Sequence, residues 1–209
     1  MAYVLTLKLK TEIYQEHKIN KSFNVAVRIY NSLLSHEIKK LNLLEQHSLY
    51  NELRYKKDKT KDDKLKLKSI REKYKLSSFD FNKDIKEIRN HYKENISSQV
   101  GQKLAKRLWS SFEKYMFGVG EEIKYKKKNT INSLEGSSNY NGIVFDGVNV
   151  SYLDMIIPVI IPNDDYTKES LKRKVCYCRI LRKPGKRGYH YYVQLVLDGF
   201  SLTKEKKVV

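Results

Sequence analysis

Cysteine is scarce in this sequence, which argues against thiol chemistry and a disulfide scaffold. The 209 residues contain two cysteines, Cys176 and Cys178. They lie two positions apart in a strand-like run, so their side chains are expected to face the same way. A lone Cys-x-Cys is a poor zinc site, and a disulfide at this spacing is strained. We therefore expect two small free thiols in a reducing compartment.

Long hydrophobic runs and an N-terminal targeting pattern are also absent. No apolar run approaches the length of a transmembrane helix, and the first residues do not show the charged-then-apolar pattern of a signal peptide. Hydrophobic residues make up 40% of the sequence and charged residues 32%, which is a polar but globular composition. We expect a soluble intracellular protein with no membrane partner, long enough for one large domain or two small ones.

The motifs of common enzyme classes are missing as well. There is no G-x-x-x-x-G-K-[ST], no G-x-S-x-G and no glycine-rich dinucleotide loop. A two-metal nuclease needs several converging carboxylates, whereas Asp146 lies in an Asp-Gly turn, and Asp154 and the pair Asp164-Asp165 are typical of solvated residues. No H-x-x-x-H or H-E-x-x-H spacing occurs among the five histidines, which are His17, His36, His47, His91 and His190. We expect a binding protein with no catalytic residue, metal site or cofactor in this chain, and an unrecognised metal-dependent nuclease is an alternative.

Acidic residues are far outnumbered by basic ones. The sequence has 42 Lys and Arg against 24 Asp and Glu, a formal net charge of +18 and a pI near 9.7. Such an excess indicates a polyanionic partner, although a genome rich in A and T, which enriches Lys and Asn, would account for part of it. Sixteen tyrosines lie among the cations, which suits base stacking together with phosphate contact. Nucleic acid is the expected partner.

The first half of the chain is predicted to be one strand followed by helices. Residues 2–10 alternate apolar and polar side chains as a half-buried strand does, and this strand must pair with a distant segment. Apolar residues then recur at spacings of three and four from residue 20 to about 45, which predicts an amphipathic helix. Further helices are expected at 49–56, within the polar stretch 55–75 (with Leu65 and Ile70 as apolar marks), from a Ser78 or Asp80 cap to residue 92, and from a Ser97 or Ser98 cap to Gly118.

The helix that ends at Gly118 carries a polar and basic N-terminal half. Helix N-termini present free backbone N–H groups and a partial positive charge, and both suit phosphate. An ordinary solvated helix face is the alternative interpretation. The residues concerned are Gln99, Gln102, Lys103, Lys106 and Arg107.

Residues 123–139, IKYKKKNTINSLEGSSN, separate the helical half from a half with short β-type runs. Lys124, Lys126, Lys127 and Lys128 fill four of five consecutive positions, which we call the basic run (residues 124–128). Small and amide side chains follow it. We interpret the whole stretch as the boundary between two substructures and as a place where nucleic acid lies against the protein.

The second half is predicted to be β-rich. Residues 142–150 resemble a hairpin built on Asp146-Gly147, and 155–161 a buried strand that Pro158 assigns to an edge or a bulge. Residues 166–174 form a short polar helix or loop. The runs 175–181 and 189–197 flank a basic turn at 182–188. These elements predict an α+β fold, in which a β-barrel-like unit made from the first strand and residues 131–209 is interrupted by a helical insertion.

Several segments carry a resemblance to a known family. They are FNVAVRIYNSLL, QVGQKLAKRLWSSFEKY, IKYKKKNTINSLEGSSNYNGI, IIPVII, and KVCYCRILRK with GYHYYVQLVLDG. In this order they resemble the N-terminal half of the transposon-encoded TnpB proteins, RNA-guided nucleases related to the compact type V CRISPR effectors. The resemblance covers essentially all of residues 1–209, and NSLEGSSN with GI and YCRI with YYVQLVL are its most specific parts.

The resemblance implies a wedge (WED) β-barrel that is interrupted after its first strand by a helical recognition (REC) domain. It assigns residues 1–11 to the first WED strand, 12–121 to the REC domain and 122–209 to the remainder of the WED barrel. In that family these domains hold the guide (omega) RNA and read a short transposon-adjacent motif on target double-stranded DNA. Both nucleic acids are therefore expected partners, in the cytoplasm of a prokaryote and in association with the nucleoid.

The family's contacts can be carried onto this chain residue by residue. Gln102 falls at the motif-reading glutamine of the last REC helix, whereas Ser98 and Gln99 replace a lysine and an aromatic residue of some relatives, so a different motif is expected. The basic run matches a Pro-Arg-Phe-Lys-type segment but has no proline. Motif recognition is expected from Ser98, Gln99, Gln102, Lys103, Asn132 and Ser133. RNA or phosphate contact is expected from Lys8, Lys10, Arg28, Lys106, Arg107, Lys124, Lys126, Lys127, Lys128, Asn129, Asn139, Arg182, Lys183, Lys186 and Arg187.

The relatives continue beyond the strand that matches residues 189–197 into a RuvC nuclease domain, which opens with an Asp-x-Gly strand. This chain contains no such strand, so it is expected not to cleave DNA alone. The catalytic carboxylates, their magnesium and a zinc ribbon are expected only in a RuvC-containing remainder, which would be a further partner. The alternative function is a guide-independent nucleic-acid-binding regulator derived from a transposon gene.

Overall fold

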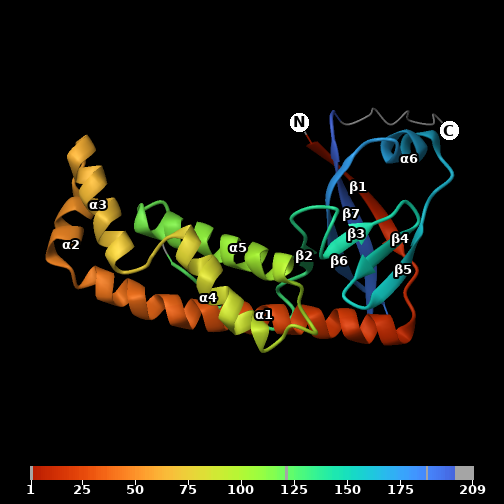
Figure 1. Cartoon of the computed structure of the whole chain (residues 1–209), viewed down its shortest axis with the longest axis horizontal. Helices are drawn as coiled ribbons and strands as arrows, with labels where there is room; N and C mark the ends of the chain where they lie inside the picture. Colours follow the sequence, from red (N-terminus) through yellow and green to blue (C-terminus); the bar gives the residue numbers. More distant parts are fainter. Residues whose placement is uncertain (1, 121, 187, 201–209) are drawn as a thin grey trace.

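Strand β1 (Ala2–Leu9) has an interior position in a seven-stranded sheet of order β2-β6-β7-β1-β5-β4-β3 (Figure 1). The structure is a computed structural model and describes residues 2–120, 122–186 and 188–200. All neighbouring strands pair antiparallel. The other strands are β2 (Ser133–Glu135), β3 (Ile143–Phe145), β4 (Asn149–Tyr152), β5 (Met155–Ile160), β6 (Val175–Gly185) and β7 (Gly188–Asp198).

The alternating sequence of β1 explains its place in the sheet. Every second side chain, from Tyr3 to Leu9, is apolar and buried in the core, and the intervening side chains are exposed. The strand pairs with β7 over most of its length, with Leu5 opposite Leu195, and its last two residues pair with β5. The predicted half-buried strand with distant partners is therefore confirmed.

Five helices follow β1 before the chain returns to the sheet, and a sixth lies between β5 and β6 (Figure 1). Helix α1 runs beneath both the sheet and helices α4 and α5. The bounds of the helices are α1 (Ile13–Glu45), α2 (Ser48–Tyr55), α3 (Lys61–Lys73), α4 (Ser78–Asn90), α5 (Ser98–Met116) and α6 (Asp165–Leu171).

Helix α1 begins at Ile13 and not at the predicted residue 20. Its first two turns bury only Gln15 and Ile19, so their apolar periodicity is too sparse to reveal a helix. Gln15 docks this end of the helix: its amide oxygen accepts a hydrogen bond from the Glu12 backbone N–H (3.0 Å), and its amide nitrogen donates to the Ile156 carbonyl of β5 (3.0 Å). The 33-residue helix thereby joins the sheet to the helical part of the chain.

The caps of α4 and α5 and the buried face of α3 agree only in part with the predictions. Helix α4 is capped by Ser77, whose hydroxyl accepts from the Asp80 N–H at 3.3 Å, and not by Ser78 or Asp80. Leu65 is exposed, because α3 buries the face that carries Leu67 and Ile70. Helix α5 is capped by Ser97, one of the two predicted caps.

Strand β5 lies between β1 and β4 and is not an edge strand, so the edge prediction is wrong. The carbonyl of Pro158 accepts a hydrogen bond from the Lys10 N–H at 2.8 Å. A residue's N–H and C=O point to the same side of a strand, so the N–H that proline lacks would face the chain just past the end of β1. Proline is tolerated because only the last bond of this ladder is lost.

The β3–β4 hairpin on Asp146-Gly147 is present as predicted. The carboxylate of Asp146 accepts hydrogen bonds from the N–H groups of Val148 (2.9 Å) and Asn149 (2.6 Å), which lower the pKa of this carboxyl. The basic hairpin differs from its prediction. Strands β6 and β7 pair as far as Gly185 opposite Gly188, so Arg182 and Lys183 are strand residues and not turn residues.

The sheet curls into a half-barrel, and with the helices this makes the fold α+β, as predicted. Asn139 helps to close the curl, because its side chain bonds the backbone of Phe145 on β3 (2.8 and 3.0 Å) and accepts from the Cys178 thiol of β6 (3.2 Å). Both cysteines are free, as predicted. Burial raises the pKa of Cys178 to about 12. None of the helices within the described residues is long and apolar enough to cross a membrane.

Candidate nucleic-acid interface

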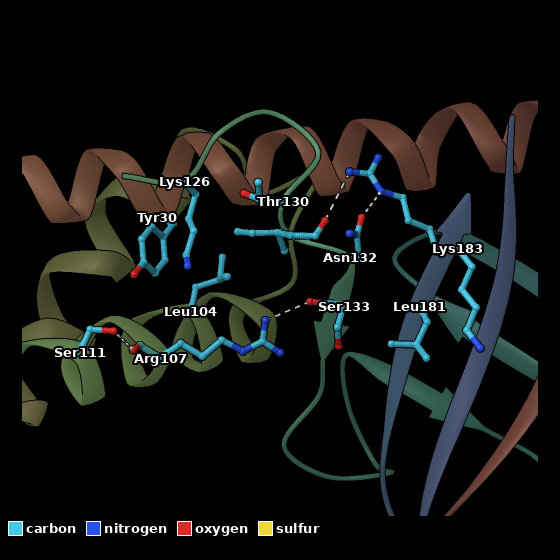
Figure 2. Close-up of a pocket in the computed structure, with 12 residues that line it drawn as sticks. Tyr30, Leu104, Arg107, Ser111, Lys126, Thr130, Asn132, Ser133, Leu181 and Lys183 are labelled. Carbon is cyan, nitrogen blue, oxygen red and sulfur yellow. Dashed lines mark hydrogen bonds between the residues drawn. The ribbon is translucent and has the colours of Figure 1, made fainter. Parts of the chain in front are cut away.

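A cleft of about 610 Å³ lies where α1, α5, the loop before β2 and strand β6 meet (Figure 2). It brings together six residues predicted to contact nucleic acid, namely Arg107, Lys126, Asn132, Ser133, Arg182 and Lys183. None of the described residues that line it is acidic. The remaining lining residues are Tyr30, Leu104, Ser111, Thr130, Ile131 and Leu181.

One stripe of helix α5 faces strand β2 and the loop that follows it. Gln99, Lys103 and Arg107 recur at a spacing of four and so lie on one face of the helix. The Gln99 amide accepts from the Ser137 N–H (2.8 Å) and donates to the Ser138 hydroxyl (3.2 Å). These bonds occupy the Gln99 amide, which is one of the amides predicted to contact the DNA motif.

Lys103 and Arg107 converge on Glu135 of β2. Their nitrogens lie 3.0 and 3.3 Å from its carboxylate, and Nε of Arg179 lies 3.2 Å from it. Burial alone would raise the pKa of Glu135, but these three cations outweigh that effect and lower it. Three cations share one carboxylate, so the group keeps a net positive charge beside the cleft. Arg107 also donates to the Ser133 carbonyl at 3.1 Å (Figure 2).

The adjacent stripe of α5 is free of these contacts to β2. Ser98, Gln102 and Lys106 also recur at a spacing of four, and all three are exposed. They do not line the cleft. Helix α5 therefore presents one polar face to the loop and strand beside it and a second polar face to solvent.

The basic run is held against α1. The Asn31 side chain accepts from the Lys126 backbone N–H (2.8 Å) and donates to its carbonyl (2.9 Å). The Tyr125 hydroxyl lies 3.2 Å from that of Ser35, and the Lys126 ammonium lies 5.6 Å from the centre of the Tyr30 ring. The backbone is thus ordered, whereas the lysine side chains are exposed.

Arg182 is the central residue of this region, and its side chain is 3% exposed. Its guanidinium donates to the side-chain oxygens of Asn132 (3.1 Å), Asn20 (3.2 Å) and Asn129 (3.3 Å) and to the Ile131 carbonyl (3.3 Å). It lies between the rings of Phe23 and Tyr189, at 4.5 and 4.6 Å from their centres. Burial lowers the pKa of Arg182, although arginine stays charged in proteins.

Three asparagines that were predicted to contact nucleic acid have partners within the protein. The oxygens of Asn129 and Asn132 hold Arg182, and Asn129 adopts a left-handed backbone (φ 65°), which asparagine tolerates. Asn139 is bonded to β3 and lies outside the cleft. All three therefore have a structural role, and Asn132 is in addition exposed at the cleft wall.

The other predicted cations among the described residues do not line the cleft. Lys8 and Lys10 are exposed at the end of β1, and Lys8 is paired with Tyr192, whose ring lies 4.9 Å from the Lys183 ammonium. Lys186 is exposed at the β6–β7 turn, and Arg187 is outside the described residues. The others are exposed on α1, which carries Arg28, and on the loop, which carries Lys124, Lys127 and Lys128.

The cleft also uses residues that the sequence did not single out. Asn20 and Asn31 lie on α1 next to its apolar stripe and bind Arg182 and the basic run. Tyr30 counted only as a core residue, yet it lines the cleft. The only signal for these residues in the sequence was the position of the two amides beside an apolar helical stripe, because a solvated helix face favours charged residues.

A second polar cluster joins α1 to α4. Ligand atoms of His36, Glu37 and Asp84 lie within 4.8 Å of one another. The Lys40 ammonium contacts both carboxylates and already supplies the cluster with positive charge. Burial, with a hydrogen bond to Asp84, raises the pKa of Glu37 to about 8.

Two of the other acidic candidates make contacts within the fold. Asp154 pairs with Lys18 (2.5 Å), and Asp164 caps α6 by accepting from the Thr167 N–H (2.8 Å).

Two comparisons with known proteins complete the description of the site. No protein-family model matches the chain, and no curated protein matches it at a significant level.

Proposed function

We propose that this chain is a nucleic-acid-binding module of an RNA-guided DNA endonuclease similar to TnpB, in which it holds guide RNA and recognises a short DNA motif. The observation that carries the proposal is the cleft, where predicted cations and an amide from α5, the loop before β2 and strand β6 meet, and no described lining residue is acidic. In this proposal, cleavage and its magnesium belong to a RuvC domain outside these 209 residues.

The chemistry of the cleft suits a phosphate backbone. Lys126 and Lys183 supply compact charges, and Arg107, whose Nη1 and Nη2 also bond Ser133 and Glu135, adds the charge of its guanidinium. An A-form RNA is recognised mainly through its shape, its phosphates and its 2′-hydroxyls. Sequence choice would then be left to pairing between guide and target.

The two polar faces of α5 support a division of labour. The face with Lys103 and Arg107 is tied to β2 beside the cleft, whereas the face with Ser98, Gln102 and Lys106 is exposed. A glutamine amide is able to make paired hydrogen bonds to adenine in the major groove. The proposal therefore assigns RNA to the cleft and the DNA motif to the exposed face.

The test is a salt titration of binding to structured RNA. The slope of log K against log salt concentration is negative. Removing three phosphate contacts with K126A/K127A/K128A should reduce its magnitude by about 2, because fewer counterions are released. The matched control is K168A/K172A/K174A, which removes three exposed lysines in and after α6. This control variant should change the slope much less than K126A/K127A/K128A does.

Two outcomes would contradict the proposal. The first is an equal fall in slope for both triple variants, which would reduce the basic run to general surface charge. The second is protein that purifies free of RNA and binds duplex DNA with sequence preference. That outcome would favour the guide-independent regulator.

A further inference from the structure

A second cavity lies at the other end of α5, against α2 and α3, and has a volume of about 340 Å³. It shares no lining residue with the cleft. Its floor is apolar: Leu67 and Met116 are buried, and Tyr50 is 1% exposed. Phe117 stands at the rim with 58% of its surface exposed.

The rest of the lining is cationic. Arg54, Lys59, Lys64 and Arg71 line the cavity, and no described lining residue is acidic. Arg54 is neutralised by Glu45 at 3.1 Å. In contrast, Lys59 and Arg71 donate to backbone carbonyls, of Lys56 (2.7 Å) and Leu67 (3.3 Å). These neutral acceptors leave the charge of the two side chains available to an anion.

A flat aromatic surface adjoins these charges. The guanidinium of Arg71 lies 4.9 Å from the centre of the Phe117 ring. Stacked arginine and phenylalanine form a planar face on which another planar group is able to stack.

The hydroxyl of Tyr50 gives independent evidence for a ligand. It is buried and has no hydrogen-bond partner among the described residues. Buried polar groups in native proteins nearly always have a partner. The guanidinium of Arg54 lies 5.9 Å from the centre of the Tyr50 ring, which places a cationic side chain of the cavity beside this residue.

We propose that this cavity binds a single nucleotide, with its base against Met116 and Phe117 and its phosphate on Lys59, Lys64 and Arg71. The Tyr50 hydroxyl bonds the ligand. The volume is at the lower end of ligand pockets, which span about 300–1,000 Å³, so it suits one nucleotide and not a longer segment. The nucleotide is either free or an unpaired residue of a longer strand. The inference does not rest on the cleft, because the two sites have no residue in common.

The methionines provide a direct test in the full chain. Met116 lines the cavity and Met155 is buried in the sheet, so ¹³C-methyl labelling gives a reporter and an internal control. Titration with AMP or with a short oligoadenylate should shift the Met116 methyl signal by ring-current effects and leave that of Met155 in place. Inorganic phosphate should not produce this shift.

Two double variants test the cationic side. K59A/K64A should weaken nucleotide binding about threefold to tenfold, the effect expected of two solvent-facing charges. The control is K66A/K68A, which removes the same charge from α3, where these lysines pair with Asp62 (2.6 Å) and Glu72 (3.8 Å). It should bind like the parent.

The outcomes separate the sources of the ligand. A Met116 shift with AMP identifies a free nucleotide as sufficient, and a shift with the oligonucleotide alone identifies an unpaired residue of a strand. The proposal is overturned if neither ligand shifts Met116, or if K66A/K68A weakens binding as much as K59A/K64A. K126A/K127A/K128A should leave the shift unchanged, so failure of the cleft and failure of this cavity are distinguishable.

Discussion

Replacing Arg182 with methionine should destabilise the protein by a small but measurable amount. The side chain is buried, yet all four of its acceptors are neutral: the oxygens of Asn20, Asn129 and Asn132 and the carbonyl of Ile131. Removing a cation from such a site leaves no opposite charge unpaired. The cost should therefore be below the roughly 3–5 kcal/mol that follows when one partner of a buried ion pair is lost.

The structure sets the size of the effect. Four hydrogen bonds to a charged group contribute at least about 1.5 kcal/mol each, and two ring contacts, to Phe23 and Tyr189, add about 1 kcal/mol each. Dehydration of the guanidinium opposes them by several kcal/mol, roughly 5. Methionine recovers about 1 kcal/mol of apolar burial. The balance predicts a loss of about 2 kcal/mol in the free energy of unfolding.

The lysine variant sharpens the prediction. Lysine at position 182 keeps the charge in the buried site, but one ammonium cannot reach four acceptors spread around a planar fork. R182K should therefore be no more stable than R182M. Urea unfolding followed by far-UV circular dichroism and by the fluorescence of Trp109, the single tryptophan, measures both. The reasoning is refuted if R182K is the milder change, or if R182M unfolds like the parent.

Three further predictions concern other sites. Q102A should relax the DNA motif preference by about 1–3 kcal/mol and leave RNA affinity unchanged, as measured by competition between duplexes. N31A should speed amide exchange at Lys126 about fivefold, because it removes a hydrogen bond of 2.8 Å worth about 1 kcal/mol. For Glu37, the folded state keeps a proton that the unfolded state loses above pH 4.5, since burial raises its pKa to about 8. Stability should thus fall by roughly 4 kcal/mol as pH rises from 4.5 to 8, and E37Q, which can still bond Asp84, should remove this fall.

Each of these has a result that would contradict it. Equal losses of RNA affinity and motif preference in Q102A would make Gln102 a general contact. Unchanged exchange at Lys126 in N31A would mean that the loop is ordered by other contacts. A pH profile of E37Q that parallels that of the parent would assign the titration to another group.

Much of the fold follows from local patterns, and the errors occur where long-range contacts decide. The period of two in β1 and the cap signals of α5 were sufficient, because each element also buries one face. The start of α1 was missed because its first turns are held by bonds to β5 and not by apolar packing. Pro158 was assigned to an edge or a bulge because the rule for proline assumes full pairing on both sides, whereas β1 ends beside it.

The composition of the candidate site was easier to predict than the roles of its residues. Charge and spacing selected Arg107, Lys126 and Lys183, which line the cleft. Arg182 was assigned to a turn, since nothing near it in the sequence reveals that Asn20, 162 residues away, is one of its acceptors. A buried cation is recognisable only when its acceptors are known, and these come from separate elements.

The contacts that hold the loop separate two properties that a basic segment usually combines. A flexible run of lysines binds a polyanion through charge but must be ordered on binding, at about 1–2 kcal/mol for each backbone residue fixed. Asn31 and Arg182 order this loop before any ligand is bound, so less of the interaction energy is lost. Charge then sets the salt slope, and pre-ordering sets the affinity at a given salt concentration. N31A should therefore lower RNA affinity without changing the slope of log K against log salt concentration. K126A/K127A/K128A should reduce the magnitude of that slope. A basic segment that is not held by bonds such as those of Asn31 would not show this difference.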